Sequence, residues 1–155
     1  VKGNLRAAYQ TIQLRFRPHT REDFEREAQS KNRYEVNRAK AMLLAYDSGS
    51  PVRSTPYPVQ AIRLGNGPVV VALGGEVVVD YQLKIKQTYP RTKVIVAGYS
   101  NDVMSYIPSV RVLREGGYEA ESSMIYYGMP GPYTEEVEES ILGSVRSVMK
   151  RVGLK

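Results

Sequence analysis

The fold is decided by residues 69 to 106, which hold two short apolar runs separated by one helical stretch. The first run is Val69-Val70-Val71-Ala72-Leu73, followed by Gly74-Gly75-Glu76, and the second is Val94-Ile95-Val96-Ala97, followed by Gly98-Tyr99-Ser100-Asn101. Both runs are rich in β-branched residues and bounded by glycine, so we expect two fully buried strands. The stretch from Val78 to Tyr89 has the length and periodicity of one helix, which Pro90 ends. Together they predict a βαβ unit with parallel strands and a right-handed crossover.

This arrangement brings two polar side chains toward the same edge of the sheet. Glu76 comes directly after the first strand, and the loop from Gly98 to Tyr106 leaves the end of the second. Ligands bind at the carboxyl ends of parallel strands, and neighbouring strands lie about 4.8 Å apart. We therefore expect the Glu76 carboxylate and the Tyr106 phenol to meet in one pocket. The alternative is that Glu76 only caps the following helix, where an acid is favoured by the helix dipole.

The segments before this unit predict a strand, a helix and a hairpin. Residues 9 to 17 alternate between apolar and polar, which predicts a strand with one exposed face. Thr20-Arg21-Glu22-Asp23 resembles a capping box and predicts the start of a long helix reaching about Asp47. Residues 59–64 and 69–73, joined by Gly65-Asn66-Gly67-Pro68, predict a β-hairpin. The sheet is therefore expected to be mixed.

The segments after Tyr106 predict a final helix and shorter pieces before it. A short helix is expected to run through Arg114, Ser122 to Tyr127 is expected to be a strand or extended, and residues 128–132 irregular. Thr134 is expected to cap the last helix, whose acidic start and basic end complement the helix dipole. Its apolar stripe should pack on the sheet and consists of Val137, Ile141, Val145, Val148 and Val152. The predicted fold class is α/β, with a mixed β-sheet, a βαβ unit and flanking helices.

Length and composition narrow the class of protein. The chain has 155 residues, 42% of them apolar, which suits one domain with a real core. It has no cysteine, so disulfides and thiolate metal sites are excluded. No run has the length of a membrane helix, and the start lacks the features of a signal peptide. Because the chain begins at Val1 rather than Met, we expect it to be a piece of a longer protein.

The charge balance bears on possible partners. A net charge of +6 and a pI near 9.5 suggest nucleic acid. Between Arg21 and Lys40, however, basic residues alternate with acidic ones, as on a solvated helix face, and the chain has no Trp and two Phe. We therefore expect no nucleic-acid binding, and consider a membrane surface with anionic headgroups the better partner for the basic residues.

Several small motifs, in order, carry a resemblance to a known family. They are Tyr57-Pro58-Val59-Gln60, then Ala72-Leu73-Gly74-Gly75-Glu76-Val77, then Gly98-Tyr99-Ser100-Asn101 with Tyr106, and finally Gly117-Tyr118-Glu119-Ala120. Residues 56 to 150 thereby resemble the later part of the catalytic domain of neutral (alkaline, non-lysosomal) ceramidases. Two positions depart from the family pattern. Gly74 stands where the family has Pro, and Val77-Val78 replace Phe-Thr, which leaves the acyl-chain and headgroup specificity open.

The resemblance implies a function at matching positions only. Neutral ceramidases hold a zinc ion with two histidines, a glutamate and a tyrosine, and hydrolyse the amide of N-acyl sphingoid lipids. The glutamate matches Glu76 and the tyrosine matches Tyr106, while Tyr99, Asn101 and Tyr118 are candidates for substrate binding. The family's histidines and catalytic residues lie upstream, so no catalytic residue is assigned within this chain. By the same resemblance the parent protein would be secreted, periplasmic or membrane-associated.

The expected function is therefore that of one part of a catalytic domain whose N-terminal part is missing. Two oxygen ligands make a poor zinc site, and His19 is the one histidine, so we expect weak zinc binding and no ceramide hydrolysis by this chain alone. Surface normally covered by the missing part is expected to cause self-association. Two alternatives stay open: a non-catalytic lipid- or protein-interaction module without the metal, and an unrelated small α/β domain whose Gly-Gly-Glu turn caps a helix.

Overall fold

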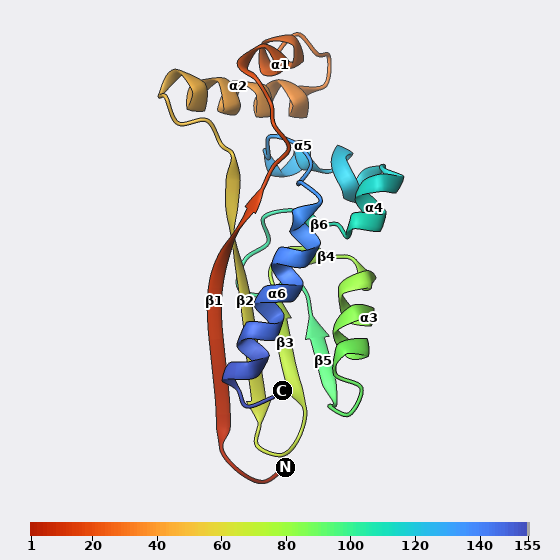
Figure 1. The fold of residues 1–155 in the computed structure, drawn as a ribbon. Helices are drawn as coiled ribbons and strands as arrows, with labels where there is room; N and C mark the ends of the chain where they lie inside the picture. Colours follow the sequence, from red (N-terminus) through yellow and green to blue (C-terminus); the bar gives the residue numbers. More distant parts are fainter. Residues whose placement is uncertain (155) are drawn as a thin grey trace.

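A four-stranded mixed sheet forms the centre of the molecule in the computed structural model, which describes residues 1–154 (Figure 1). Its strand order is β1-β2-β3-β5. The strands are β1 (Leu5–Arg15), β2 (Ser54–Leu64), β3 (Val69–Leu73) and β5 (Val94–Ala97). β2 runs antiparallel to both of its neighbours, β1 and β3, and β5 runs parallel to β3. The predicted hairpin and βαβ unit, with α3 (Val79–Thr88) as the crossover helix, are confirmed, as is the α/β class.

A second, two-stranded ladder lies at the carboxyl ends of β3 and β5. It consists of β4 (Glu76–Val77) and β6 (Tyr106–Ile107), which pair in parallel with Glu76 opposite Tyr106. Because β6 pairs with β4 and not with β5, β5 is an edge strand of the main sheet. Ile95 is accordingly 46% exposed. The prediction of a fully buried second strand is therefore wrong, whereas β3 is buried along most of its length.

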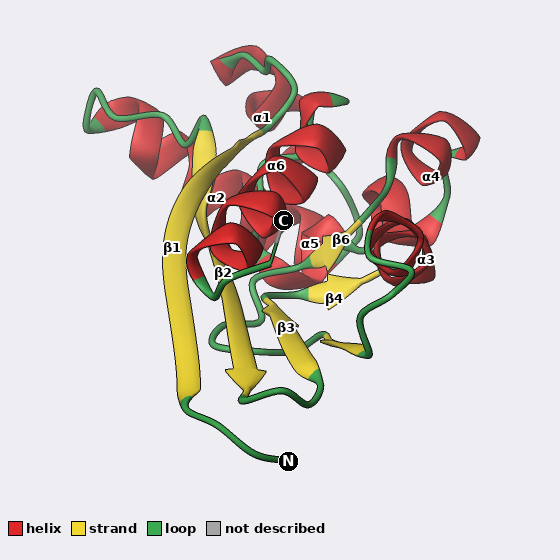
Figure 2. Cartoon of the chain, turned by 60° about the horizontal axis from the view of Figure 1, so that its bottom comes forward, coloured by secondary structure: helices red, strands yellow, loops and turns green. Residues whose placement is uncertain are grey.

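Helices α3 and α6 (Glu136–Arg151) cover one face of the sheet (Figures 1 and 2). The predicted stripe of α6 is buried at all five positions and packs with Tyr81 and Ile85 of α3 in the main core. The start of α6 differs from the prediction. Glu135 is the N-cap, and the Thr134 hydroxyl is buried without a hydrogen-bond partner among the described residues.

The opposite face of the sheet is apolar but carries no helix among residues 1–154 that packs extensively on it (Figure 2). One residue from each strand lies in register across this face: Ala7, Ile62, Val70 and Ile95. These side chains point away from α6, because side chains alternate between the two faces of a strand. All-parallel sheets are covered on both faces, whereas antiparallel sheets often leave one face to water, and this mixed sheet has one parallel pair. The row is therefore a surface that another layer could cover.

The segment before β2 forms two helices and not the single long helix that the sequence predicts. They are α1 (Arg21–Glu27) and α2 (Arg33–Asp47). The capping box at Thr20 is present, as predicted. The break occurs because the Asn32 side chain accepts a hydrogen bond from the Tyr34 backbone N–H (3.0 Å) and starts a new helix. Phe24, Ala39 and Met42 form a small core of their own between the two helices.

The segment between β6 and α6 is mainly helical. It contains the predicted short helix α4 (Val110–Glu115), a π-helical turn η1 (Tyr118–Ser122) and α5 (Met124–Tyr127). The predicted strand at residues 122–127 is therefore wrong. Ala120 and Met124 are both buried, and their spacing of four residues suits a helical face. Among the described residues, none of the helices combines the length and apolar character needed to span a bilayer.

Candidate functional site

The turn between β3 and β4 places Glu76, and it requires glycine at position 75. Gly75 has φ +68°, a left-handed conformation that side chains disfavour. A Cβ atom there would lie 2.6 Å from Cγ1 of Ile107 and 2.7 Å from the backbone oxygen of Ser105. The Gly75 N–H donates to the Asp102 carbonyl at 2.8 Å. The turn therefore lies directly against β6 and the residues before it.

The loop after β5 is fastened to the same turn by backbone hydrogen bonds. The Tyr99 N–H donates to the Gly75 carbonyl (2.9 Å), and the Ser100 N–H donates to the Leu73 carbonyl (3.0 Å). Tyr99 has φ +52°, which is rare for a residue with a large side chain. A non-glycine residue in this region costs about 1–2 kcal/mol. The surrounding contacts hold this strained backbone and direct the Tyr99 phenol at Glu76.

The Glu76 carboxylate is surrounded by tyrosine hydroxyls from three separate segments. The Tyr99 hydroxyl donates to Oε2 at 2.7 Å, and the Tyr127 hydroxyl of α5 donates to Oε1. Tyr106 lies opposite Glu76 in the β4–β6 ladder. Hydrogen bonding to Tyr127, and then to Tyr99 and Tyr106, holds the pKa of the Glu76 carboxyl below its usual value. The predicted proximity of Glu76 and Tyr106 is thus found, with two further phenols.

The same contacts keep the phenols protonated. The hydrogen bond to Glu76 raises the pKa of Tyr106 to about 12 and also raises the pKa of Tyr99. The pKa of Tyr127 is raised by burial and by its bond to Glu76. At neutral pH the cluster therefore consists of one carboxylate and three neutral hydroxyl donors. We call Glu76, Tyr99, Tyr106 and Tyr127 the phenol–carboxylate cluster.

Glu76 does not act as a helix cap. The N-cap of α3 is Val78, and no side chain makes a capping hydrogen bond there. The acid in the first turn of α3 is Asp80. The interpretation of Glu76 as only a helix cap is therefore wrong.

An open cavity of about 430 Å³ adjoins the cluster. Valine side chains and tyrosine rings make part of its wall, and acidic side chains make much of the rest. The lining residues are Glu76, Val77, Val78, Val79, Tyr99, Tyr106, Arg111, Val112, Glu115, Gly116 and Glu119. Glu76 and Tyr106, which come from neighbouring strands, thus face one cavity.

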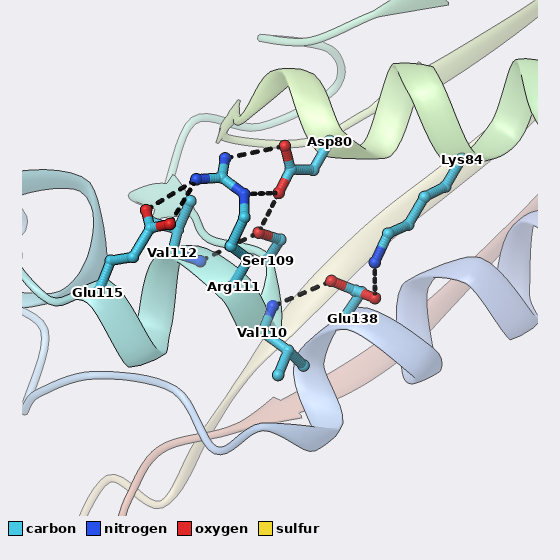
Figure 3. A network of polar contacts seen from close by, with 8 residues as sticks. All are labelled: Asp80, Lys84, Ser109, Val110, Arg111, Val112, Glu115 and Glu138. Atoms are coloured by element: carbon cyan, nitrogen blue, oxygen red, sulfur yellow. Dashed lines mark hydrogen bonds and ion pairs between the residues drawn. The ribbon is translucent and has the colours of Figure 1, made fainter.

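Arg111 is the one cation among the described lining residues, and its guanidinium is already paired (Figure 3). It donates to both carboxylate oxygens of Asp80 at 3.0 Å and to both oxygens of Glu115 at 2.7 and 2.8 Å. These bonds link α3 to α4 and lower the pKa of the Asp80 carboxyl. Because Arg111 is paired in this way, Glu76 and Glu119 leave the cavity with an excess of negative charge.

Further polar contacts join α3, α4 and α6 beside the Arg111 ion pairs (Figure 3). Glu138 of α6 accepts from the Val110 N–H at 2.9 Å and pairs with Lys84 of α3. Ser109, which caps α4, donates to Asp80 at 2.5 Å. Helices α3, α4 and α6 are therefore cross-linked beside the cavity, which fixes the position of its α4 wall.

The other predicted site residues are placed differently. Tyr99 lines the cavity, whereas Asn101 is exposed and is not among the lining residues. Tyr118 also lies outside the lining, but its ring packs edge-on against Tyr106 with centroids 5.5 Å apart. His19 bonds to Tyr46 and to the Val52 carbonyl beside the α1–α2 pair.

Sequence reasoning missed Tyr127, because residues 122–127 were expected to be extended. The pair Tyr126-Tyr127 before Gly128 is the signal that marks this segment, but nothing in it indicates a partner 51 residues away at Glu76. Tyrosine rings also continue beyond the cluster. Four rings form a row in which each contacts the next. The centroid distances are 5.5 Å from Tyr106 to Tyr118, 6.3 Å from Tyr118 to Tyr126, and 4.9 Å from Tyr126 to Tyr34.

The capacity of the site for a metal is limited. Residues 1–154 contain no group of three or more His, Cys, Asp or Glu side chains placed to hold a metal ion. A catalytic zinc ion usually has three protein ligands, with imidazole or thiolate common among them. Glu76 and Tyr106 can supply two oxygen ligands from adjacent strands. They fit as part of a zinc site and do not complete one.

No protein family model, no curated protein and no solved structure matches the chain. The resemblance to neutral ceramidases therefore stays a prediction that rests on the sequence motifs alone.

Proposed function

We propose that this chain supplies a glutamate and a tyrosine, Glu76 and Tyr106, to the zinc site of an amide hydrolase acting on ceramide-like N-acyl sphingoid lipids. The observation that carries the proposal is the register of β4 and β6, which sets an acid opposite a phenol at the edge of an open cavity. The sequence motifs around both residues support the same assignment. The remaining ligands, including imidazoles, would come from another part of the catalytic domain.

The roles of the residues follow from their chemistry. When bound, zinc lowers the pKa of a water ligand from 15.7 to about 7 and polarises a carbonyl group. Glu76 contributes a negative charge, which the Tyr99 and Tyr127 hydroxyls stabilise and orient. Tyr106 would bind as phenolate, so the proton that its hydroxyl now holds beside Glu76 would have to leave. The valines of the cavity wall offer an apolar surface to the lipid part of a substrate.

A zinc titration tests the proposal directly. Calorimetry, combined with ultraviolet difference spectra of tyrosinate, should show weak binding that generates tyrosinate. Glu76→Gln and Tyr106→Phe should each remove that binding. Tyr118→Phe is the matched control, because Tyr118 touches Tyr106 by its ring and does not line the cavity. Tight stoichiometric binding would contradict an incomplete site, and binding insensitive to Glu76→Gln would overturn the metal role.

An interaction module without catalysis is the second candidate, and a separate observation favours it. The row of rings Tyr34, Tyr126, Tyr118 and Tyr106 is partly exposed, and tyrosine is enriched at protein interfaces. The full reading frame separates the two functions. Two metal-spaced histidines upstream support the hydrolase, and their absence supports the module.

A further inference from the structure

The amino ends of β3 and β5, opposite the Glu76 cavity, gather unpaired cations. The residues concerned are Lys2, Arg6, Arg63, Arg91, Lys93 and Lys150, which we call the basic end. They line three cavities that adjoin one another, because Arg63 lines two of them and Leu154 links the second to the third. Within residues 1–154, no acidic side chain lines any of the three. Among the described residues, none of the six cations forms an ion pair.

The strand register brings two of these cations face to face. Arg6 of β1 lies directly opposite Arg63 of β2. Like charges directly opposite each other in antiparallel strands are destabilising. The Arg63 guanidinium donates to the carbonyls of Val152 and Gly153 just after α6. Arg6 has no acidic side chain of residues 1–154 beside it in the cavity that it lines. An arrangement that costs stability here suits a surface that receives an anion.

Apolar groups accompany the cations. The third cavity, of about 480 Å³, is lined mainly by apolar surface from Tyr89 and Leu154, with Arg146 and Lys150 at its margin. Leu154 lines the second cavity as well, so this apolar surface adjoins Arg91 and Lys93. Tyrosine and leucine beside lysine and arginine are typical of surfaces that sit at the boundary between headgroups and acyl chains. Nucleic acid would use the cations but gain nothing from the apolar surface of Tyr89 and Leu154.

We propose that the basic end docks on an anionic phospholipid membrane, with the cations at the headgroups and the Tyr89–Leu154 cavity toward the acyl boundary. The contact is separate from the Glu76 cavity, since the two lie at opposite ends of β3 and β5. It therefore stands or falls independently of the zinc proposal.

Co-sedimentation with vesicles tests the docking. The full chain is mixed with phosphatidylcholine vesicles that contain or lack phosphatidylserine. Each cation near such a surface contributes about five-fold to affinity, so Arg91→Gln combined with Lys93→Gln should weaken binding about 25-fold. The matched control neutralises two exposed lysines at the far end of the molecule, Lys31 just before α2 and Lys40 within it (Lys31→Gln with Lys40→Gln), and should stay within about two-fold of wild type. Leu154→Gln should weaken binding, whereas Leu44→Gln, at an exposed leucine of α2, should not.

Three outcomes would overturn the proposal: no binding to the anionic vesicles at low salt, equal losses in the two double variants, or binding to duplex DNA as tight as to vesicles. Glu76→Gln should bind vesicles like wild type. A loss in that variant would contradict the separation of the two sites. Circular dichroism of each variant checks that the exposed substitutions leave the fold intact.

Discussion

The two ends of β3 and β5 differ in how they are built. At the carboxyl ends, a glycine that tolerates no Cβ and a tyrosine with positive φ fix one carboxylate among three phenols. At the amino ends, six cations share a surface, and none of them forms an ion pair within residues 1–154. Fixed geometry suits a ligand recognised atom by atom, and summed charge suits an extended surface. The same two strands thus carry a site of fixed geometry at their carboxyl ends and a charged surface at their amino ends.

The largest effect is expected at the turn that positions Glu76. Gly75→Ala should lower the free energy of unfolding by about 3 kcal/mol, because the cost of the positive φ adds to the cost of the overlap between the new Cβ and Ile107. Gly128 has a similar φ of +66° in the left-handed region with nothing near its Cβ position, so Gly128→Ala should cost about 1 kcal/mol. Urea denaturation measures both. Equal losses would mean that close packing of the turn is unimportant.

A smaller effect is expected from the phenols. Tyr127→Phe should cost about 1 kcal/mol at neutral pH, because the Glu76 carboxylate loses one hydrogen-bond donor. Tyr126→Phe, at an exposed neighbour, should be near neutral. The folded-state pKa of Glu76 is depressed, so the stabilisation is present above the usual carboxyl pKa of 4.5 and is lost as pH falls through the folded value. Wild type and Tyr127→Phe should therefore converge in stability in acid. A gap that persists there would contradict this origin.

At the basic end, in contrast, a substitution is expected to raise the free energy of unfolding. Arg6→Glu would place an acid opposite Arg63 and should stabilise the protein by about 0.5 kcal/mol while weakening vesicle binding. Arg15→Glu, on the same strand but opposite Ser54, should change stability little. Thermal unfolding with vesicle sedimentation checks both. Destabilisation by Arg6→Glu would show that the Arg6–Arg63 pairing carries no strain.

The weakest effect concerns the open face of the sheet. The apolar row Ala7, Ile62, Val70 and Ile95 should support self-association with a dissociation constant on the order of 1 mM. Ile95→Lys should reduce it, and Leu44→Lys on α2 should not. Light scattering that shows a strict monomer at high concentration would contradict this use of the face.

Much of the fold near Glu76 follows from local sequence. Glycine-bounded β-branched runs specify β3 and β5, and the rule that parallel strands end at one edge places Glu76 beside Tyr106. The features that the sequence did not predict correctly depend on contacts between residues far apart in the chain. Tyr127 reaches Glu76 only because η1 and α5 are helical, and the exposed Ile95 depends on β6 pairing with β4. The break at Asn32 was readable in principle, because asparagine is a strong N-cap, but the surrounding helical pattern concealed it.

The most direct measurement of the central claim is an NMR pH titration of the Glu76 carboxyl carbon in wild type and Tyr127→Phe. The account predicts a pKa below the usual 4.5 in wild type and a higher value in the variant, because the phenols stabilise the carboxylate. A wild-type pKa at or above 4.5 that the substitution leaves unchanged would show that the phenols do not hold Glu76, and the proposed ligand pair would lose its basis.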